Sequence, residues 1–458
     1  MNFSGEEIAA AIGAEIVARG DSGSPVRTTI ESSETQAGDL FFGLRGERVD
    51  GGEFAPAAIE AGAWGVVVER SLKDFGRYMG HNASTTADNW VFAVADPLAA
   101  LQSLARAWRR ALGARVIGIT GSVGKTSVKD IARVLLPGRV HANRENLNTE
   151  IGLPLTVLEA PPEAEVLVLE MAMRGAGQIA ELAAIAEPEV AVITNVGPVH
   201  VELLGSVEAI AAAKAEVLAA LPPGGTAVAP AAAGELEPHL GAAPRLLRFG
   251  PGGDVYAAET RTEGGVTDAL VETPAGQARF HFPFSEAHNL ENALAAIAAG
   301  IALGAPPAAM ADRAANIGFS RFRGERLEMG DGIVLVNDCY NANPVSMRAA
   351  LSHLASLGGG RRIAVFGEMA ELGPAAAGYH HEVGEAARGE GVDLLVGVGE
   401  AARDYDPDEL VETPEEAAEL LAAQLGPGDT VLVKGSRSAG LEAVAEALEG
   451  LLEAPADG

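Results

Sequence analysis

Apolar and polar positions along this chain alternate in blocks that predict short buried strands separated by helices. From residue 115 to about residue 320, apolar runs of strand length are followed by stretches of helical periodicity. This alternation is typical of a mostly parallel sheet covered by helices, in which ligands bind beyond the carboxyl ends of the strands. The strands predicted here are 115–120, 166–170, 190–194 and 227–229.

A different pattern occurs on each side of this segment. Residues 1–95 contain short strands and turns, with a loop predicted over 71–89, and a helix is predicted over 98–112. After about residue 320 a second, smaller α/β alternation has the proportions of a Rossmann-like unit. Its predicted strands are 333–337, 362–366, 394–398 and 430–434. The chain is therefore α/β in class, and the domains expected are residues 1–95, 96–320 and 321–458.

Composition agrees with a large intracellular protein. A chain of 458 residues, 48% of them apolar, can form about three domains. No segment has the pattern of a signal peptide or of a membrane span. Cys339 is the only cysteine, so we expect no internal disulfide and a cytoplasmic location. The net charge of −30 argues against nucleic acid as a partner, and an anionic substrate would have to be bound by local basic groups.

The run RVIGITGSVGKT predicts a phosphate-binding turn between a strand and a helix. Gly121 and Gly124 free the backbone for a tight turn, so amide N–H groups can converge on phosphate oxygens at a helix N-terminus. Lys125 adds positive charge, and Thr126 offers a hydroxyl to Mg²⁺. The usual P-loop has glycine where this chain has Ile119, so the turn is a shorter variant. A plain strand–helix turn is the alternative.

Three further titratable side chains are candidates for a functional site because of their positions in the predicted elements. Glu170 closes the strand EVLVLE, either above a ligand crevice or as an exposed loop carboxylate. His200 follows the turn NVGPV, where a structural hydrogen-bonding role is the alternative. Lys214 lies on the apolar stripe of its helix, and a lysine that faces a core needs a partner or a changed charge. A stem that packs inward while the ammonium stays in water is equally compatible with this periodicity.

Amide and charged side chains form a second group of candidates. Asn289 and Asn292 are i, i+3 neighbours at a helix start, where they can cap the helix or pair with the edge of a base. Arg326 lies between a turn and a strand, and Asp338 lies directly beyond a strand in VNDCYNANP. These positions favour a ligand site over a turn cluster.

Taken together, the motifs of this chain resemble those of a known family. The runs TGSVGKTS, NLNTEIGLPLT, LEMAMRGAGQI, NVGPVH, AKAE, HNLENALAA, GERLE and DCYNANPVSM occur in the order found in Mur ligases, the ATP-dependent amide-forming enzymes of peptidoglycan synthesis. The resemblance covers about residues 27–448. In the last segment, FGEMAELGPAAAGYHHEVG and VLVKGSRSAGLE resemble the member that adds D-alanyl-D-alanine to UDP-N-acetylmuramoyl-tripeptide.

The resemblance implies a reaction. The N-terminal domain would bind the UDP-sugar, the central P-loop domain would bind ATP, and the Rossmann-like C-terminal domain would close over both. The tripeptide carboxylate would take the γ-phosphoryl group of ATP and form an acyl phosphate. The amine of D-alanyl-D-alanine would then attack, and phosphate would leave. Lys125, two Mg²⁺ ions and the turn N–H groups would stabilise the negative charge. A monomer is expected.

The resemblance also implies roles for individual residues. The catalytic group would comprise Lys125, Glu170, His200 and Lys214. The Mg²⁺ ligands would be Thr126, Glu170, His200 and Lys214, the lysine as a carbamate. The ATP site would comprise Gly121, Ser122, Val123, Gly124, Lys125, Thr126, Ser127, Asn289, Asn292, Arg326 and Asp338. The UDP-substrate site would comprise Ser32, Asp50, Gly51, Phe54, Asn146, Asn148 and Thr149.

One departure and three alternatives accompany this interpretation. The family's N-terminal Asp-Ser/Thr-Arg motif appears here as Glu31-Ser32-Ser33, without the arginine, which leaves the UDP contacts open. The sister ligase that adds the diamino acid is an alternative, although its Asn-Pro-Arg-type motif is absent from the last segment. Folylpolyglutamate synthase lacks the N-terminal segment found here. A P-loop nucleotide-binding protein that forms no bond is the third alternative.

Overall fold

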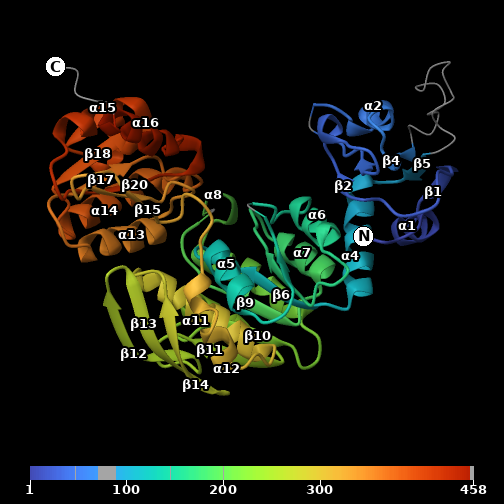
Figure 1. Cartoon of the computed structure of the whole chain (residues 1–458), viewed down its shortest axis with the longest axis horizontal. Helices are drawn as coiled ribbons and strands as arrows, with labels where there is room; N and C mark the ends of the chain where they lie inside the picture. Colours follow the sequence, from blue (N-terminus) through green and yellow to red (C-terminus); the bar gives the residue numbers. More distant parts are fainter. Residues whose placement is uncertain (47, 71–88, 145, 200, 454–458) are drawn as a thin grey trace.

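The computed structural model describes residues 1–46, 48–70, 89–144, 146–199 and 201–453. The loop predicted over 71–89 falls almost wholly outside them. Within these residues four sheets follow one another along the chain (Figure 1). None of the helices in this part of the chain combines the length and apolar character of a membrane span.

The N-terminal sheet has the strand order β1-β5-β4-β3-β2, with β1 antiparallel to β5 and the other pairs parallel. Its strands are β1 (Glu15–Ala18), β2 (Thr28–Thr29), β3 (Leu40–Phe42), β4 (Gly65–Glu69) and β5 (Trp90–Val94), and its helices are α1 (Gly5–Ile12) and α2 (Ala55–Glu60). Buried valine and phenylalanine fill β3 to β5, which explains why these runs form strands.

Helix α4 (Pro97–Leu112) joins the N-terminal sheet to the next one. The Asp96 carboxylate accepts hydrogen bonds from the first free N–H groups of the helix, and proline occupies its first turn. The apolar face of α4, with Leu101, Leu104 and Trp108 buried, belongs to one hydrophobic cluster that runs from α1 into the central sheet. The first two sheets therefore share a continuous core.

The central sheet is wholly parallel, in the order β11-β10-β9-β6-β8-β7. Its strands are β6 (Arg115–Thr120), β7 (Val140–Ala142), β8 (Val166–Glu170), β9 (Val190–Ile193), β10 (Thr226–Pro230) and β11 (Arg245–Phe249). Its helices are α5 (Lys125–Leu135), α6 (Gly152–Glu159), α7 (Gln178–Ala186), α8 (Val201–Leu204), α9 (Val207–Ala215), α10 (Glu237–Leu240), α11 (Ala287–Ala302) and α12 (Pro307–Ala311). The predicted parallel sheet is confirmed. Because its strands are parallel, their carboxyl ends lie at one edge of the sheet.

A three-stranded antiparallel sheet follows, which the sequence analysis did not predict. It consists of β12 (Tyr256–Glu263), β13 (Val266–Thr273) and β14 (Gly276–Phe282), paired as successive hairpins. Only one face of this sheet is buried, and it contributes Ala269, Val271, Phe280 and Phe282 to the core beneath α11. Such a sheet shows alternation with a period of two rather than a continuous apolar run, which is why a search for buried strands missed it.

The C-terminal sheet has the order β15-β16-β20-β17-β18-β19, with β15 antiparallel and the other pairs parallel. Its strands are β15 (Glu325–Glu328), β16 (Val334–Asn337), β17 (Arg362–Phe366), β18 (Leu394–Val398), β19 (Glu409–Val411) and β20 (Thr430–Lys434). Its helices are α13 (Pro344–Ser356), α14 (Ala376–Gly389), α15 (Pro414–Gln424) and α16 (Glu442–Glu453). Separate hydrophobic clusters cover the two faces of this sheet.

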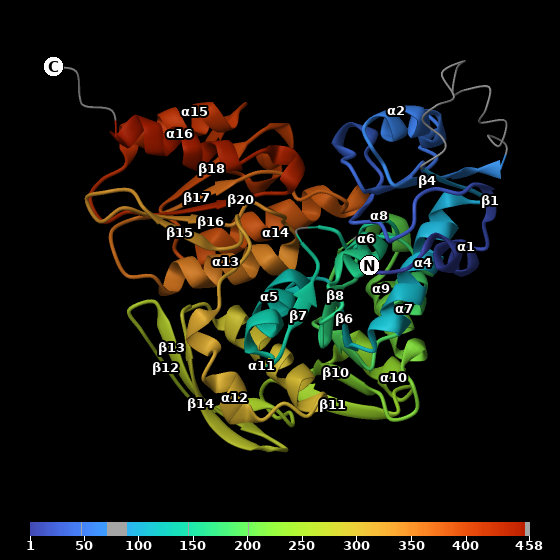
Figure 2. The same ribbon diagram turned by 45° about the vertical axis from the view of Figure 1, so that its right-hand side comes forward.

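The C-terminal sheet lies beside α5 and α11, with α13 facing the hairpin of β12 and β13 (Figures 1 and 2). Residues 318–324 connect it to the central part of the chain. The loops after β16, β17 and β20 meet at its carboxyl edge: the Gly367 N–H donates to the Lys434 carbonyl, and the Ser436 N–H donates to the Glu368 carbonyl. Tyr405 braces the same edge through a hydrogen bond of 2.9 Å from its hydroxyl to the Gly367 carbonyl.

Helix α14 packs so closely on the Tyr405 segment that residue 384 must be glycine. A Cβ built on Gly384 would lie 2.0 Å from the Tyr405 carbonyl oxygen, whereas one built on Gly378 of the same helix meets nothing within 4 Å. We expect Gly384→Ala to lower the free energy of unfolding by about 1–3 kcal/mol through overpacking. Gly378→Ala should leave it unchanged or raise it slightly. Urea unfolding of the two variants measures the difference, and equal stabilities would contradict the packing described.

Candidate active site

The turn between β6 and α5 leaves a helix N-terminus open to a ligand. Gly121 and Gly124 adopt φ values of +151° and +83°, which few other residues tolerate. Gly124 caps α5 without a side chain, so the N–H groups of Lys125, Thr126 and Ser127 have no capping oxygen. These N–H groups and the helix dipole together form a site for an anion such as phosphate.

The next strand in the sheet holds this turn in place. Asn195, directly beyond β9, accepts a 2.9 Å hydrogen bond from the Val123 N–H and donates one of 3.2 Å to the Val123 carbonyl. The Thr194 hydroxyl donates to the same carbonyl. Ser122 is also bound, since its hydroxyl donates to the Gly197 carbonyl. The first part of the turn is thus fixed by protein groups, and the N–H groups that remain belong to the start of α5.

Glu170 lies beneath the start of α5. Only 2% of the residue is exposed, and its two carboxylate oxygens accept hydrogen bonds of 2.8 Å from the Thr126 hydroxyl and the Asn148 amide. The Glu170 N–H donates to the Asn143 side chain, which fixes the end of β8. The sequence analysis assigned Asn148 to the loop that reaches the UDP-substrate, and the structure shows that its amide also donates to Glu170.

Two lysine ammonium groups lie in the same part of the site. Lys125 donates a 2.8 Å hydrogen bond to the Gly121 carbonyl, and desolvation lowers its pKa, although the charge of Glu170 opposes this shift. Lys214, on α9, is 2% exposed, and its pKa lies well below the usual value because of burial first and the positive charge of Lys125 second. In the part of the chain that the structure describes, Lys214 has no carboxylate partner. His200 lies outside the described residues.

The start of α11 brings its amides against the same turn. A Cβ on Gly124 would lie 2.3 Å from the Asn292 side-chain oxygen, so Asn292 touches the turn directly. Asn292 donates to Asn289, which donates to Glu286, each over 3.3 Å. The structure therefore places Asn289 and Asn292 beside the proposed phosphate site.

The C-terminal part contains the other charged groups that the sequence analysis assigned to the ATP site. Asp338 pairs with the buried Lys434, whose ammonium lies 2.6 Å from the carboxylate and also donates to the backbone carbonyls of Asp338 and Asn341. Arg326, on β15, forms an ion pair with the exposed Glu328. Lys434 was not singled out in the sequence, although a lysine that closes a strand is the same signal that identified Glu170.

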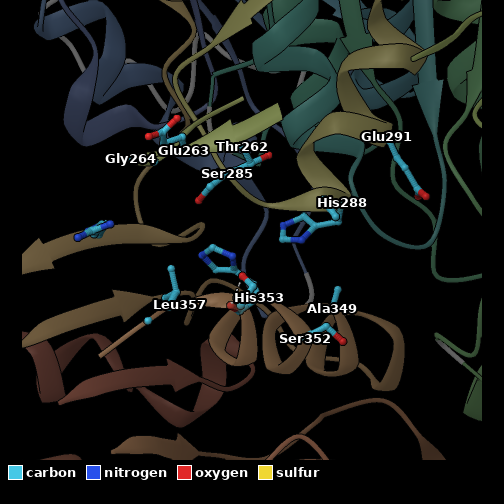
Figure 3. A pocket seen from close by; sticks show the side chains of 15 residues that line it. Thr262, Glu263, Gly264, Ser285, His288, Glu291, Ala349, Ser352, His353 and Leu357 are labelled. Atoms are coloured by element: carbon cyan, nitrogen blue, oxygen red, sulfur yellow. Dashed lines mark hydrogen bonds between the residues drawn. The ribbon is translucent and has the colours of Figure 1, made fainter. Parts of the chain in front are cut away.

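Arg326 lines a cavity of about 690 Å³ between α11, α13 and the hairpin of β12 and β13. Figure 3 shows His288 and His353 projecting into this space from α11 and α13. Burial lowers the pKa of both imidazoles, while Asp338 and Glu286 oppose the shift. The His353 ring nitrogen lies 3.4 Å from the Glu286 carboxylate, a contact that links the C-terminal sheet to the start of α11.

The remaining candidates lie elsewhere. Asp50 caps the turn Gly51–Phe54 beyond β3 by accepting from the Gly52 N–H, and Phe54 is 44% exposed. Ser32 begins another short turn of the N-terminal sheet. Asn146 and Thr149 lie in the loop before α6, where the Thr149 hydroxyl accepts from the Gly152 N–H. Asn146 and Thr149 thus belong to the same loop as Asn148, whereas Ser32, Asp50, Gly51 and Phe54 belong to turns of the N-terminal sheet.

A helix N-terminus prepared for phosphate, with a buried carboxylate and two lysines at the edge of a parallel sheet, defines a P-loop nucleotide-binding protein. The chain also matches three family models: the Mur ligase family catalytic domain over residues 27–109, the Mur ligase middle domain over 119–300 and the Mur ligase glutamate ligase domain over 322–437. The chain belongs to the Mur ligase family.

Individual relatives resemble nearly the whole chain. The UDP-N-acetylmuramoyl-tripeptide–D-alanyl-D-alanine ligase of Synechocystis sp. is 38% identical over 428 residues, which cover 90% of this chain and 89% of the relative. Crystal structure I of MurF from Acinetobacter baumannii has a TM-score of 0.88 at 27% identity and covers 98% of this chain and 99% of that one. MurF ligase from Thermotoga maritima in complex with ADP has a TM-score of 0.83 at 30% identity, with 93% and 98% covered. The predicted three-domain architecture is confirmed.

The low pKa of Lys214 gives a stability prediction with a defined sign. Below about pH 10 the unfolded chain binds a proton at Lys214 that the folded chain binds less readily, so this lysine destabilises the fold. We expect Lys214→Met to be more stable than the wild type near pH 7, and the difference to shrink as pH rises toward about 10. Urea unfolding in CO₂-free buffer without Mg²⁺ measures it.

Lys129 offers a matched control for this variant. It is equally buried, but its ammonium lies 3.1 Å from the Asp130 carboxylate, so Lys129→Met leaves a buried charge unpaired and should destabilise the fold. If Lys214→Met were also less stable than the wild type across the whole pH range, Lys214 would have a stabilising partner, and the account of its charge would be wrong.

Proposed function

We propose that this protein is the ligase that joins D-alanyl-D-alanine to UDP-N-acetylmuramoyl-tripeptide, with hydrolysis of ATP to ADP and phosphate. The observation that carries the proposal is the near full-length likeness to relatives that bear this activity in their names, at 33–38% identity. The geometry supports it, because the site combines a phosphate-binding helix start with groups from a separate C-terminal sheet.

ATP would bind with its phosphates at the start of α5. The free N–H groups there and the Lys125 ammonium would neutralise the phosphates. Asn289 and Asn292 would contact the base, while Arg326 and Asp338 would approach from the C-terminal sheet. Since the nucleotide then touches both parts of the molecule, its binding favours the closed arrangement.

The residues around α5 fit Mg²⁺. Mg²⁺ prefers oxygen ligands and usually combines one or two carboxylates with substrate phosphates and water. The Thr126 hydroxyl and the Glu170 carboxylate, 2.8 Å apart beneath the phosphate site, offer that combination. The described residues contain no group of three or more histidine, cysteine or acidic side chains placed to hold a metal by themselves. When bound, Mg²⁺ would supply positive charge against the transferred phosphoryl group.

Lys214 would act as a carbamate. Its low pKa favours the neutral amine, which is the form that adds CO₂ at nitrogen and releases a proton to solvent. The product is an anion with oxygen ligands of the kind Mg²⁺ prefers, and it removes the repulsion between Lys214 and Lys125. His200 is proposed beside it from the family resemblance.

The reaction then proceeds in two steps. A terminal carboxylate oxygen of the tripeptide attacks the γ-phosphorus of ATP, ADP leaves, and an acyl phosphate remains. The amine of D-alanyl-D-alanine attacks the acyl carbon, phosphate leaves, and the amine loses a proton. We assign UDP recognition to Ser32, Asp50, Gly51 and Phe54, and the muramoyl contacts to Asn146, Asn148 and Thr149. The proposed domains are 1–95, 96–320 and 321–458. The cytoplasmic location and the monomeric state stay predictions from the sequence.

Substrate dependence tests the proposed function. Phosphate release from ATP should require both UDP-N-acetylmuramoyl-tripeptide and D-alanyl-D-alanine, and mass spectrometry should find the pentapeptide product. Release with UDP-muramoyl-dipeptide and a diamino acid would identify the sister ligase instead. Release with ATP alone would exclude a ligase of either kind.

The same assay tests the phosphate site. Lys125→Ala removes the charge that meets the transferred phosphoryl group, so we expect turnover to fall by at least about a hundredfold with the fold intact. If this variant kept more than about a tenth of wild-type turnover, the phosphoryl-transfer site would lie elsewhere.

Carbon-13 NMR tests the carbamate. Incubation of the protein with labelled bicarbonate and Mg²⁺ should give one carbamate signal that is lost in Lys214→Met and kept in Lys129→Met. A signal that persists in Lys214→Met, or none in the wild type, would overturn the assignment.

A further inference from the structure

Arg323 lies in the segment that connects the central and C-terminal parts, and among the described residues its guanidinium has no ion pair. Its guanidinium carbon lies 3.9 Å from the centre of the Tyr340 ring. Its Nε is buried and donates to no atom in the described residues. A buried donor without a partner is unfavourable, and this chain has 63 acidic residues that could have supplied one.

The connecting segment is anchored to the helix that starts at the phosphate site. The Ser320 N–H and hydroxyl both donate to the Asp130 carboxylate, over 3.0 and 2.7 Å. Asp130 lies five residues after Lys125 on α5, which is about 7.5 Å along a helix axis. An arginine three residues after Ser320 can therefore reach the start of α5.

A second set of contacts connects the residue next to Arg323 with the phosphate turn at the start of α5. A Cβ on the next residue, Gly324, would lie 4.0 Å from the Glu286 carboxylate. Glu286 accepts from Asn289, which accepts from Asn292 at the phosphate turn. The positive charge of Arg323 also lowers the pKa of Lys125, which agrees with a short distance between the two cations.

The C-terminal part holds the arginine in this position. The Tyr340 N–H donates a 3.1 Å hydrogen bond to the Phe322 carbonyl, so the Tyr340 ring and the connecting segment are fixed to each other. Phe322 has a φ of +63°, which costs free energy for a bulky residue and turns the chain between the two parts. A planar guanidinium stacked on a ring keeps its N–H groups free at its edges for an oxyanion.

We propose that Arg323 is a catalytic residue that donates hydrogen bonds to the γ-phosphoryl group of ATP during its transfer, and that Tyr340 is its positioning residue. The proposal rests on the ligase function proposed above. The arginine meets the phosphoryl group only when the C-terminal part is docked on α5 and α11, so it couples domain closure to the chemistry. Guanidinium groups supplied in this way to phosphoryl transfer are worth large factors in rate.

Arg323→Gln tests the catalytic role. It should lower kcat by at least about a hundredfold. Calorimetry of the same variant should show an affinity for ADP close to the wild-type value, because ADP lacks the γ-phosphoryl group. The affinity for a non-hydrolysable ATP analogue should fall at least about tenfold, as expected for loss of a hydrogen bond between charged groups.

Arg321→Gln is the matched control. Arg321 is a neighbour in the same segment, its guanidinium lies 4.8 Å from the Phe322 ring centre, and its removal changes the net charge equally. The proposal is overturned if Arg321→Gln loses as much activity as Arg323→Gln, or if Arg323→Gln weakens ADP and the analogue alike. The binding measurements need no acceptor substrate, so they stand even if the wild type fails the substrate-dependence assay.

Two further variants separate positioning from folding. Tyr340→Phe keeps the ring face and should keep wild-type kcat, whereas Tyr340→Leu removes the face and should lower kcat while ADP affinity stays unchanged. Arg323→Lys keeps the charge without the planar group and should lower kcat at least about tenfold. Wild-type kcat in Arg323→Lys together with wild-type kcat in Tyr340→Leu would contradict the proposed geometry.

Discussion

The site depends on positive charge that is buried without enough negative charge beside it. Lys125 and Lys214 lie within each other's electrostatic influence, and burial lowers the pKa of both. The charge of Glu170 acts on Lys125, but the two carboxylate oxygens of Glu170 already accept hydrogen bonds from Thr126 and Asn148. The net charge of the chain is −30, yet these two buried lysines lack enough nearby carboxylates. Their positive charge therefore favours the binding of an anionic ligand. The nucleotide phosphates and the carbamate proposed at Lys214 would supply that negative charge.

The hydrophobic cores show which parts of the chain are packed together around this site. One cluster joins the N-terminal sheet to the central sheet through α4, so these two parts share one hydrophobic core. The C-terminal sheet has its own clusters on both faces and is connected through residues 318–324. Contacts between the two parts include polar ones such as that of His353 with Glu286, as is usual at surfaces that open and close. The proposed nucleotide site lies between the central and C-terminal parts.

Much of the fold and part of the site could be predicted from the sequence, because both depend on local pattern. Runs such as 115–120, 166–170 and 362–366 form strands with the predicted bounds, since β-branched residues in a short apolar run have few other stable arrangements. The stripe periodicity of Lys214 predicted its burial. The hairpins of β12 to β14, the bond from Asn148 to Glu170 and the pairing of Lys434 with Asp338 were not predicted. Each depends on which distant segment comes alongside, which local periodicity does not encode.

Arg323 illustrates the same limit at a functional residue. Nothing in the sequence separates it from Arg321 two positions before it, since both lie in a short polar connection. Only the fold brings Tyr340 under the guanidinium of Arg323 and leaves its Nε without a hydrogen-bond partner among the described residues. Residues of this kind become visible only when the three-dimensional contacts of each donor are known.

Chemical trapping of the intermediate tests the central claim most directly, namely that the buried cations serve phosphoryl transfer to a carboxylate. The enzyme would be incubated with ATP, Mg²⁺ and UDP-N-acetylmuramoyl-tripeptide, without D-alanyl-D-alanine, and then treated with borohydride, which reduces an acyl phosphate but not a carboxylate. The account predicts that the terminal carboxyl of the tripeptide is recovered as a primary alcohol, and that Lys125→Ala abolishes this product. Recovery of unreduced tripeptide alone, from an enzyme that turns over once the dipeptide is added, would contradict it.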